Sequence, residues 1–216
     1  MAKSFMMYKQ PFIPGVNRTG GAYSRSLRAN AGIEKKFFDT NAANAGDMSA
    51  GVILNSVNLI PQGTTDQTRI GNKIVIKNFN FKLGISNDNI TTLAFATPNI
   101  RVIVFVDKQC NGATAVVTDI LKTASFSSFR NMDQIDRFQI LTDQIYAARA
   151  VGTNAGNSDT GITWSAIYKK LNLDVHFSST TGAITELRSN NIGLLYFADT
   201  SLANMNGTIR VKYIDL

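Results

Sequence analysis

Residues 69–112 constrain the fold more than any other part of the sequence. Two isoleucines, Ile74 and Ile76, stand at even-numbered positions, and Lys73 and Lys77 flank the pair at odd-numbered positions. Over residues 79–85 the apolar side chains instead fall on odd-numbered positions. Side chains alternate between the two faces of a strand, so this change of parity predicts one long strand with a β-bulge near residues 77–78.

The second half of this stretch predicts a strand that is buried on both faces. Residues 100–106 are apolar at six of seven positions and rich in β-branched side chains. The strand is followed by Asn111-Gly112, a strong turn signal. Similar alternation or continuous apolar runs elsewhere predict further strands, giving eight in all: 33–40, 52–60, 74–85, 100–106, 137–149, 164–177, 192–198 and 209–214.

Eight strands without an internal repeat predict an all-β protein, a single eight-stranded jelly-roll β-sandwich over residues 33–216. One short helix is expected at 117–122, with Thr118 or Thr114 as its N-cap. Further turns are expected at 178–182 and at Asn206-Gly207. An immunoglobulin-type sandwich would be shorter, and a chain with one cysteine lacks its Cys–Trp–Cys spacing.

The positive charge is concentrated at the start of the chain. Residues 1–36 carry seven Lys and Arg against one Glu, or +6, whereas the other 180 residues carry fifteen basic and fourteen acidic side chains, or +1. Residues 1–32 also contain proline and glycine without a helix or strand period, which predicts an extended basic arm. A merely solubilising tail is the alternative.

Aromatic residues lie among these cations, and aromatic rings stack on unpaired bases. They are Tyr8, Phe12 and Tyr23. The arm is therefore predicted to bind single-stranded nucleic acid. The residues assigned to this binding are Lys3, Lys9, Arg18, Arg25, Arg28, Lys35 and Lys36. Basic residues of the shell domain are expected to add to it, with Lys73, Lys77, Lys169, Lys170, Arg210 and Lys212 as candidates.

Several short motifs follow one another in a characteristic order along the chain. They are Glu34-Lys35-Lys36-Phe37-Phe38-Asp39-Thr40, Pro61-Gln62-Gly63, Arg69-Ile70-Gly71, Asp107-Lys108-Gln109, Asn111-Gly112 and Asp119-Ile120-Leu121. Together they resemble the capsid proteins of small circular single-stranded DNA (CRESS-type) viruses, in particular the group whose shell protein is similar to that of satellite tobacco necrosis virus. The resemblance implies a jelly-roll subunit that self-assembles into an icosahedral particle around nucleic acid. We expect the smallest such shell, of about 60 subunits.

Catalytic chemistry is not expected. The chain has one histidine, His176, and one cysteine, Cys110, too few for a His/Cys metal site. Asp133 and Asp136 could together bind calcium, but a role as hydrogen-bonded turn residues is favoured over a calcium site. We therefore predict no enzyme activity, no cofactor and no metal. No apolar run is long enough to span a membrane, and no signal-peptide pattern is found, so we expect assembly inside the host cell, with the nucleus as one candidate compartment, and a final location in the virion.

Two functions remain open from the sequence. The first is a viral coat protein that forms a homo-oligomeric shell and encapsidates a single-stranded genome, with DNA favoured over RNA by the resemblance. The second is a ligand- or carbohydrate-binding jelly-roll module, for which Trp164, expected at a loop tip, could provide the aromatic contact. The second reading leaves the basic arm without a role.

Overall fold

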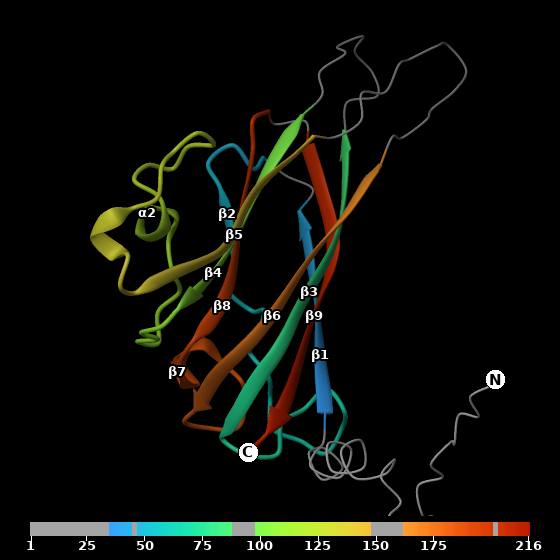
Figure 1. Ribbon diagram of the computed structural model, residues 1–216, viewed down its shortest axis with the longest axis vertical. Coiled ribbons are helices and arrows are strands. Elements are labelled where there is room, and N and C mark those ends of the chain that lie inside the picture. Colours follow the sequence, from blue (N-terminus) through green and yellow to red (C-terminus); the bar gives the residue numbers. More distant parts are fainter. Residues whose placement is uncertain (1–34, 45–46, 88–97, 148–161, 201–202) are drawn as a thin grey trace, which may run out of the picture. The chain divides into compact units, whose positions relative to one another are not determined.

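A computed structural model describes residues 35–44, 47–87, 98–147, 162–200 and 203–216. Within them nine strands form two antiparallel sheets (Figure 1). The strands are β1 (Lys35–Asn44), β2 (Val52–Leu54), β3 (Lys73–Asn87), β4 (Asn99–Asp107), β5 (Phe138–Ala147), β6 (Thr163–Phe177), β7 (Leu187–Ser189), β8 (Asn191–Ala198) and β9 (Ala203–Asp215). Three single-turn helices accompany them: α2 (Val117–Ile120), η1 (Met132–Gln134) and η2 (Ile184–Glu186).

The strand order confirms the predicted jelly roll. One sheet runs β1-β9-β3-β6-β7 and the other β2-β8-β4-β5. Apart from β4–β5 and β6–β7, consecutive strands lie in different sheets, and every pairing between strands is antiparallel. Eight strands wound between two facing sheets in this way are a jelly roll, and β7 is a short addition at one edge.

Two predictions about strand patterns are confirmed. The register of β3 shifts between Ile76 and Asn78 against both neighbouring strands, so the parity change marks a β-bulge. The apolar run of β4 is buried on both sides because each face of its sheet packs against a separate group of apolar residues. The first group fills the space between the two sheets, and the second lies on the other face, under residues 108–137.

Three local predictions are wrong. The second strand ends at Leu54, because further on the side chain of Asn58 takes over pairing: it donates to the carbonyl of Asn190 and accepts from the amide of Ile192. Asn206-Gly207 lies within β9 and forms no turn. The N-cap of α2 is Val116, neither Thr114 nor Thr118, and its amide donates to the Asp119 carboxylate over 3.0 Å.

The described residues belong to one compact unit, Glu34–Leu216. The predicted arm, 1–32, and its boundary with the shell domain lie outside the described residues. The same holds for the predicted polar loop at 152–161.

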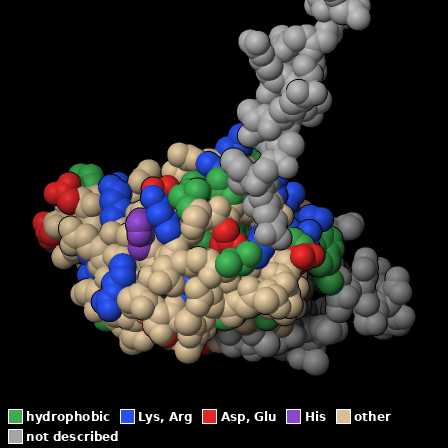
Figure 2. Space-filling view, turned by 90° about the horizontal axis from the view of Figure 1, so that it is seen from below, with side chains coloured by type: hydrophobic (Ala, Val, Ile, Leu, Met, Phe, Trp, Pro, Cys, Tyr) green, Lys and Arg blue, Asp and Glu red, His purple; other side chains and the backbone are tan. Residues whose placement is uncertain are grey.

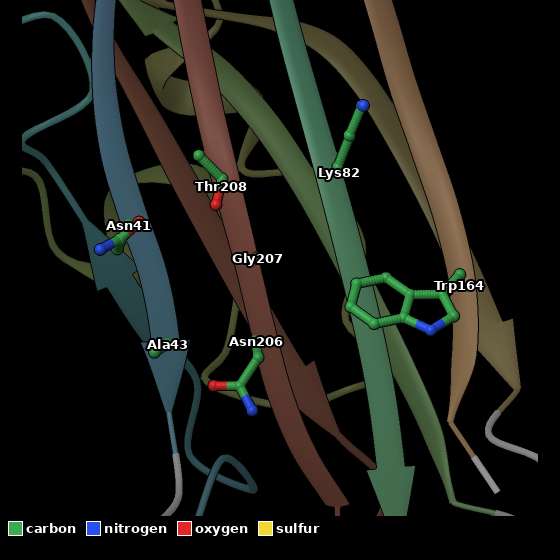
Figure 3. A pocket seen from close by; sticks show the side chains of 7 residues that line it. All are labelled: Asn41, Ala43, Lys82, Trp164, Asn206, Gly207 and Thr208. Atoms are coloured by element: carbon green, nitrogen blue, oxygen red, sulfur yellow. The ribbon is translucent and has the colours of Figure 1, made fainter.

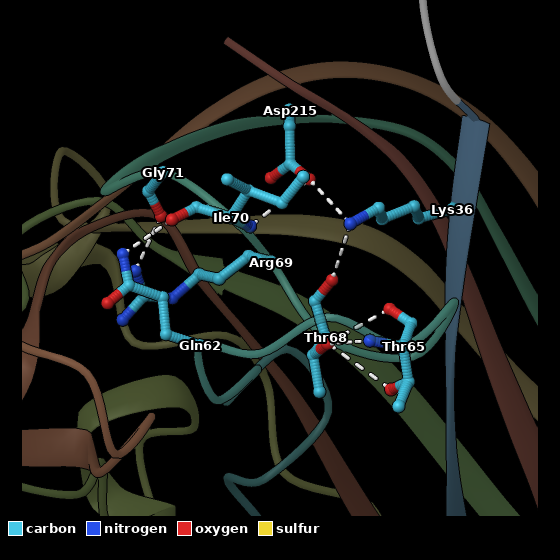
Figure 4. Close-up of polar contacts among 8 residues, drawn as sticks. All are labelled: Lys36, Gln62, Thr65, Thr68, Arg69, Ile70, Gly71 and Asp215. Atoms are coloured by element: carbon cyan, nitrogen blue, oxygen red, sulfur yellow. Dashed lines mark hydrogen bonds and ion pairs between the residues drawn. The ribbon is translucent and has the colours of Figure 1, made fainter.

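A buried arginine joins the irregular segment between β2 and β3 to the turn after β6. Figure 4 shows this arginine, Arg69, beside Gly71. Arg69 is fully buried, and its Nε donates to the carbonyl of Ile60 over 2.9 Å. Its Nη1 donates to the carbonyl of Gly71 over 2.6 Å, and its Nη2 donates to that of Ser179. The guanidinium also stacks 4.1 Å from the centre of the Phe177 ring. One side chain therefore satisfies three carbonyls in two segments that lie outside the strands.

Backbone hydrogen bonds join the motif at residues 69–71 to the motif at residues 61–63. The amide of Arg69 donates to the carbonyl of Pro61, and the amide of Gly63 donates to the carbonyl of Arg69. The side chain of Gln62 adds a bond to the carbonyl of Ile70 over 2.6 Å. The two short motifs, 61–63 and 69–71, are thus the two sides of one bridge.

An ion pair between Asp107 and Arg137 closes the insertion between β4 and β5. Asp107, 2 % exposed, accepts two hydrogen bonds from Arg137, at 2.9 and 2.7 Å. The amide of Gln109 donates to the same carboxylate over 3.0 Å. Both ends of residues 108–136 are thereby held together, and the apolar side of this insertion packs onto the outer side of the four-stranded sheet.

Replacing Arg69 with Met tests the importance of the buried guanidinium. The Arg69→Met variant keeps the apolar stem but removes the donor from one buried carbonyl, that of Ile60, and from two partly buried ones, those of Gly71 and Ser179, and an unsatisfied buried group costs about 1–3 kcal/mol. We expect the free energy of unfolding to fall by at least about 3 kcal/mol, measured by urea denaturation of the full-length subunit. The matched control is Arg188→Met, at an exposed arginine of β7, which should change it by less than about 0.5 kcal/mol. Equal effects of the two changes would contradict this role.

Candidate nucleic-acid interface

The two sheets differ in what their outer faces carry. The outer face of the four-stranded sheet is apolar and covered by the insertion, with Ile103, Phe105 and Phe197 nearly or fully buried beneath it. The outer face of the five-stranded sheet carries polar and charged side chains at alternate positions of β1, β3, β6 and β9. This second surface, here called the open face, is the candidate site.

The open face is strongly basic. Seven cations point outward from it, against two anions, Asp39 and Asp174, which gives a net charge of +5. The cations are Lys35, Lys73, Lys77, Lys82, Lys170, Arg210 and Lys212. Seen from below, the molecule carries Lys and Arg side chains at several places around its histidine (Figure 2). A clustered positive surface of this kind attracts a polyanion.

The two anions neutralise part of this charge. Asp39 accepts hydrogen bonds from Arg210 at 2.7 and 2.6 Å, which lower the pKa of the Asp39 carboxyl below its usual value. Asp174 lies 3.1 Å from the ammonium of Lys73. Among the described residues no ion pair is found for the exposed cations Lys35, Lys82, Lys170 and Lys212. These four are available to phosphates.

The strand register places the side chains of the open face in rows that cross four strands. In one row Phe37, Lys212, Asn78 and Lys170 lie side by side. The next rows contain Asp39, Arg210, Asn80 and Tyr168, and then Asn41, Thr208, Lys82 and Ala166. Each of these three rows combines at least one cation with hydrogen-bonding side chains, which suits a sugar–phosphate backbone lying across the sheet.

The last row is low and forms a shallow hollow of about 430 Å³ (Figure 3). It consists of Ala43, Asn206, Gly84 and Trp164. The indole of Trp164 reaches from β6 across β3, where Gly84 has no side chain to block it. Trp164 is 69 % exposed and lies on a strand face, so its predicted position at a loop tip is wrong.

The seven predicted nucleic-acid-binding residues are placed as follows. Lys35 is exposed on the open face, at the start of β1. Lys36 points to the other side and is 3 % exposed, with its ammonium 3.2 Å from Asp215 and donating to the carbonyl of Thr68 (Figure 4). This internal ion pair makes Lys36 a structural residue of the subunit. The remaining five, Lys3, Lys9, Arg18, Arg25 and Arg28, lie outside the described residues.

The cations proposed for the shell domain are largely brought together. Five of the six share the open face, whereas Lys169 follows the alternation of the core-facing residues of β6 and is half-buried. Sequence reasoning missed Lys82, although its position between Phe81 and Leu83 signals an outward side chain. That Lys77 and Lys82 share one face of β3 does not follow from simple alternation, because the bulge changes the parity of the strand between them.

The remaining candidates do not form a site within the described part of the chain. No group of three or more His, Cys, Asp and Glu side chains gathers there as metal ligands. The Asp133 carboxylate lies 3.1 Å from the ammonium of Lys122. Burial raises the pKa of the Cys110 thiol to about 11, so the reactive thiolate is disfavoured. No helix in this part of the chain is long and apolar enough to span a membrane.

The fold is a jelly roll with one covered face and one open basic face, an architecture that occurs in viral shell proteins and in lectin domains. The sequence profile described as "Satellite tobacco necrosis virus coat protein" matches residues 24–216. The chain therefore belongs to the satellite tobacco necrosis virus coat protein family. This membership makes it a structural protein and agrees with the expectation that it is not an enzyme.

Individual relatives are more distant. The coat protein of Maize white line mosaic satellite virus is 29% identical over 102 residues, which are 46% of this chain and 44% of that protein, so the match spans less than half of either. Among solved structures, Desmodium yellow mottle tymovirus is similar with a TM-score of 0.37 and 11% identity, covering 100% of this chain and 93% of that one. The empty head of Turnip yellow mosaic virus has a TM-score of 0.36 and 12% identity, covering 99% and 90%. The fold assignment therefore rests on the strand order given above.

The family match corrects one part of the resemblance drawn from the sequence. It supports the similarity to the satellite tobacco necrosis virus shell protein, and gives no support to circular single-stranded DNA viruses, because the matching family is one of RNA satellite viruses. Of the short motifs behind the DNA assignment, 61–63 and 69–71 form the Arg69 bridge, and Asp107 of 107–109 takes part in the closure with Arg137, so these motifs stabilise loops of the subunit.

Neutralising two exposed cations of the open face should weaken nucleic-acid binding. For the double variant Lys82→Gln/Lys212→Gln we expect lower affinity for single-stranded oligonucleotides, with the slope of log K against log salt reduced by about 1.4, or about 0.7 per lost contact. The control, Lys108→Gln/Lys122→Gln, makes the same charge change on the insertion. Fluorescence anisotropy of a labelled oligonucleotide at several salt concentrations measures both. Equal losses from the two pairs would mean that only net charge matters.

Proposed function

We propose that the chain is the coat subunit of a small icosahedral virus, and that about 60 copies form a closed shell around single-stranded nucleic acid. The observation that carries this proposal is the asymmetry of the sandwich, with one sheet covered by apolar residues and the other open and basic at +5. A shell needs such a two-sided subunit, since only one side meets the genome. The open face then lines the particle interior, and the virion is where the protein acts.

The charges support this arrangement in magnitude. Residues 1–32 contain five cations and no acid, so arm and open face together contribute +5 and +5, or +10 per subunit. About 60 subunits then supply about 600 positive charges, against roughly one thousand phosphates in a small genome. The arm alone would supply only half of this. Retained cations neutralise the remainder.

RNA is the proposed genome type. The chain's family is one of RNA satellite viruses. Amide and cationic side chains contact phosphate and sugar, which both nucleic acids share. The competing reading of a carbohydrate-binding module is not proposed, because it gives the seven cations of the open face no role.

Subunit contacts are proposed on the insertion that covers the four-stranded sheet. Phe129 is 86 % exposed, Met132 64 % and, on the adjoining β5, Ile145 60 %. Phe129 and Ile145 line one hollow beside the Arg101–Asp143 ion pair, whose hydrogen bonds are 2.8 and 2.6 Å long. Exposed apolar side chains gathered beside a rigid ion pair are typical of an interface between proteins.

A charge in this apolar group tests the assembly proposal. Phe129→Glu should leave the subunit folded, because Phe129 is almost fully exposed, and should abolish particles by placing a carboxylate in the contact. Sedimentation velocity distinguishes particles from small oligomers, and circular dichroism checks the fold. The control is Leu216→Glu, at another exposed apolar residue. Normal particles from Phe129→Glu would place the subunit contact elsewhere.

Deleting residues 2–32 tests the role of the arm. We expect particles that retain part of their nucleic acid, since the open face still contributes half of the estimated charge. The nucleic-acid content is measured by the ultraviolet absorbance of purified particles. Particles with unchanged content would remove the arm from packaging, and a complete loss of particles would indicate that the arm instead braces neighbouring subunits.

A further inference from the structure

The exposed tryptophan of the open face has no evident role in the stability of the subunit. Trp164 is 69 % exposed, although its large ring would ordinarily be placed in a core. The backbone of Gly84 lies close to one side of the ring, since a Cβ at Gly84 would be 3.0 Å from Cζ3 and 3.1 Å from Cη2 of Trp164. The indole is thus supported from below, while much of its surface is open to a ligand.

The hollow beside the ring has the composition of a nucleobase site. Gly207 lines it with backbone alone, between Asn206 and Thr208. Its walls include Asn41, Asn206 and Thr208, which offer amide and hydroxyl groups of both donor and acceptor type (Figure 3). A flat aromatic ring next to a shallow polar hollow can accept an unpaired base by stacking.

A phosphate-binding group lies within the same hollow. Lys82 lines it, is exposed, and lies in the next row, opposite Thr208 and Ala166. A second hollow of about 310 Å³ continues from there past Asn80 to Arg210. Tyr168 lies four residues after Trp164 on the same face of β6, about 13 Å away along the strand. A single strand can therefore pass from one aromatic ring to the next with Lys82 between them.

We propose that Trp164 is a stacking platform for an unpaired base of the packaged strand, and that Lys82 binds the adjacent phosphate. The inference rests on the proposed function and adds a defined subsite to it. The ligand class is single-stranded nucleic acid bound through a base of any sequence, because every base presents a π-face and stacking does not read its edges. A duplex, with its bases already stacked, is excluded from this subsite.

The chain's single tryptophan makes the subsite directly observable. Full-length subunit is titrated with a single-stranded oligoribonucleotide while tryptophan fluorescence is recorded. We expect quenching that saturates with binding. An abasic oligomer with the same number of phosphates should bind more weakly and quench little, and an RNA duplex should not quench. Equal quenching by the abasic oligomer would overturn the proposal.

Variants separate stacking from charge. Trp164→Ala should weaken binding of the labelled oligonucleotide by between about 5-fold and about 100-fold without changing its salt slope, and Trp164→Phe should restore most of the affinity. Lys82→Gln should reduce the salt slope by about 0.7 and keep the quenching. An unchanged affinity of Trp164→Ala beside a weakened Lys82→Gln/Lys212→Gln variant would overturn the stacking role alone. No effect from any of these changes would also remove the open face as the nucleic-acid interface.

Sedimentation of the Trp164 variants tests whether the ring instead belongs to a contact between subunits. If Trp164→Ala and Trp164→Phe bind the oligonucleotide like the unchanged chain but no longer form particles, the ring belongs to a contact between subunits and the proposal is wrong. If the Phe variant packages normally and the Ala variant packages less, the ring acts on nucleic acid.

Discussion

The buried guanidinium of Arg69 is the interaction on which the arrangement of loops at one end of the sandwich depends. Strand pairing satisfies the backbone within the two sheets, but residues 55–72 and 178–182 run between sheets without continuous partners. Arg69 donates to carbonyls in both segments, and its planar fork reaches several acceptors at once, as a lysine could not. Burial lowers the pKa of Arg69, and the hydrogen bonds compensate for that lost solvation.

Covering one sheet and leaving the other open gives the subunit two functionally different sides. The insertion closed by Asp107 and Arg137 buries the apolar outer face of the four-stranded sheet, so the exposed apolar side chains on this side belong to the insertion and to the adjoining β5. The five-stranded sheet needs no cover, because its outward positions are mostly charged residues, asparagines and threonines that water or phosphate can satisfy. One sandwich can therefore meet protein on one side and nucleic acid on the other.

Period-two alternation predicted the strands well wherever one face is buried, as in β6 and the two halves of β3. It failed where side chains replace strand pairing, as at Asn58, and where a glycine that resembles a turn is required by close packing. Gly207 stands within β9 because any side chain there would collide with the ring of Phe81. Such requirements come from residues more than a hundred positions away and cannot be seen in a local pattern. The same limit made motifs that hold loops together resemble the signature of a DNA virus.

The sequence by itself determined the β class, the bulge in the longest strand and the concentration of charge at residues 1–36, because these depend only on the order of neighbouring residues. Only the tertiary structure decided which cations act together. It joined Lys82, Lys170 and Lys212, from three strands far apart in the chain, on one face and turned the adjacent Lys36 into an internal ion pair. The physical reason is register: a shift of one residue moves a side chain to the opposite face of a sheet, and register is fixed by pairing between distant strands.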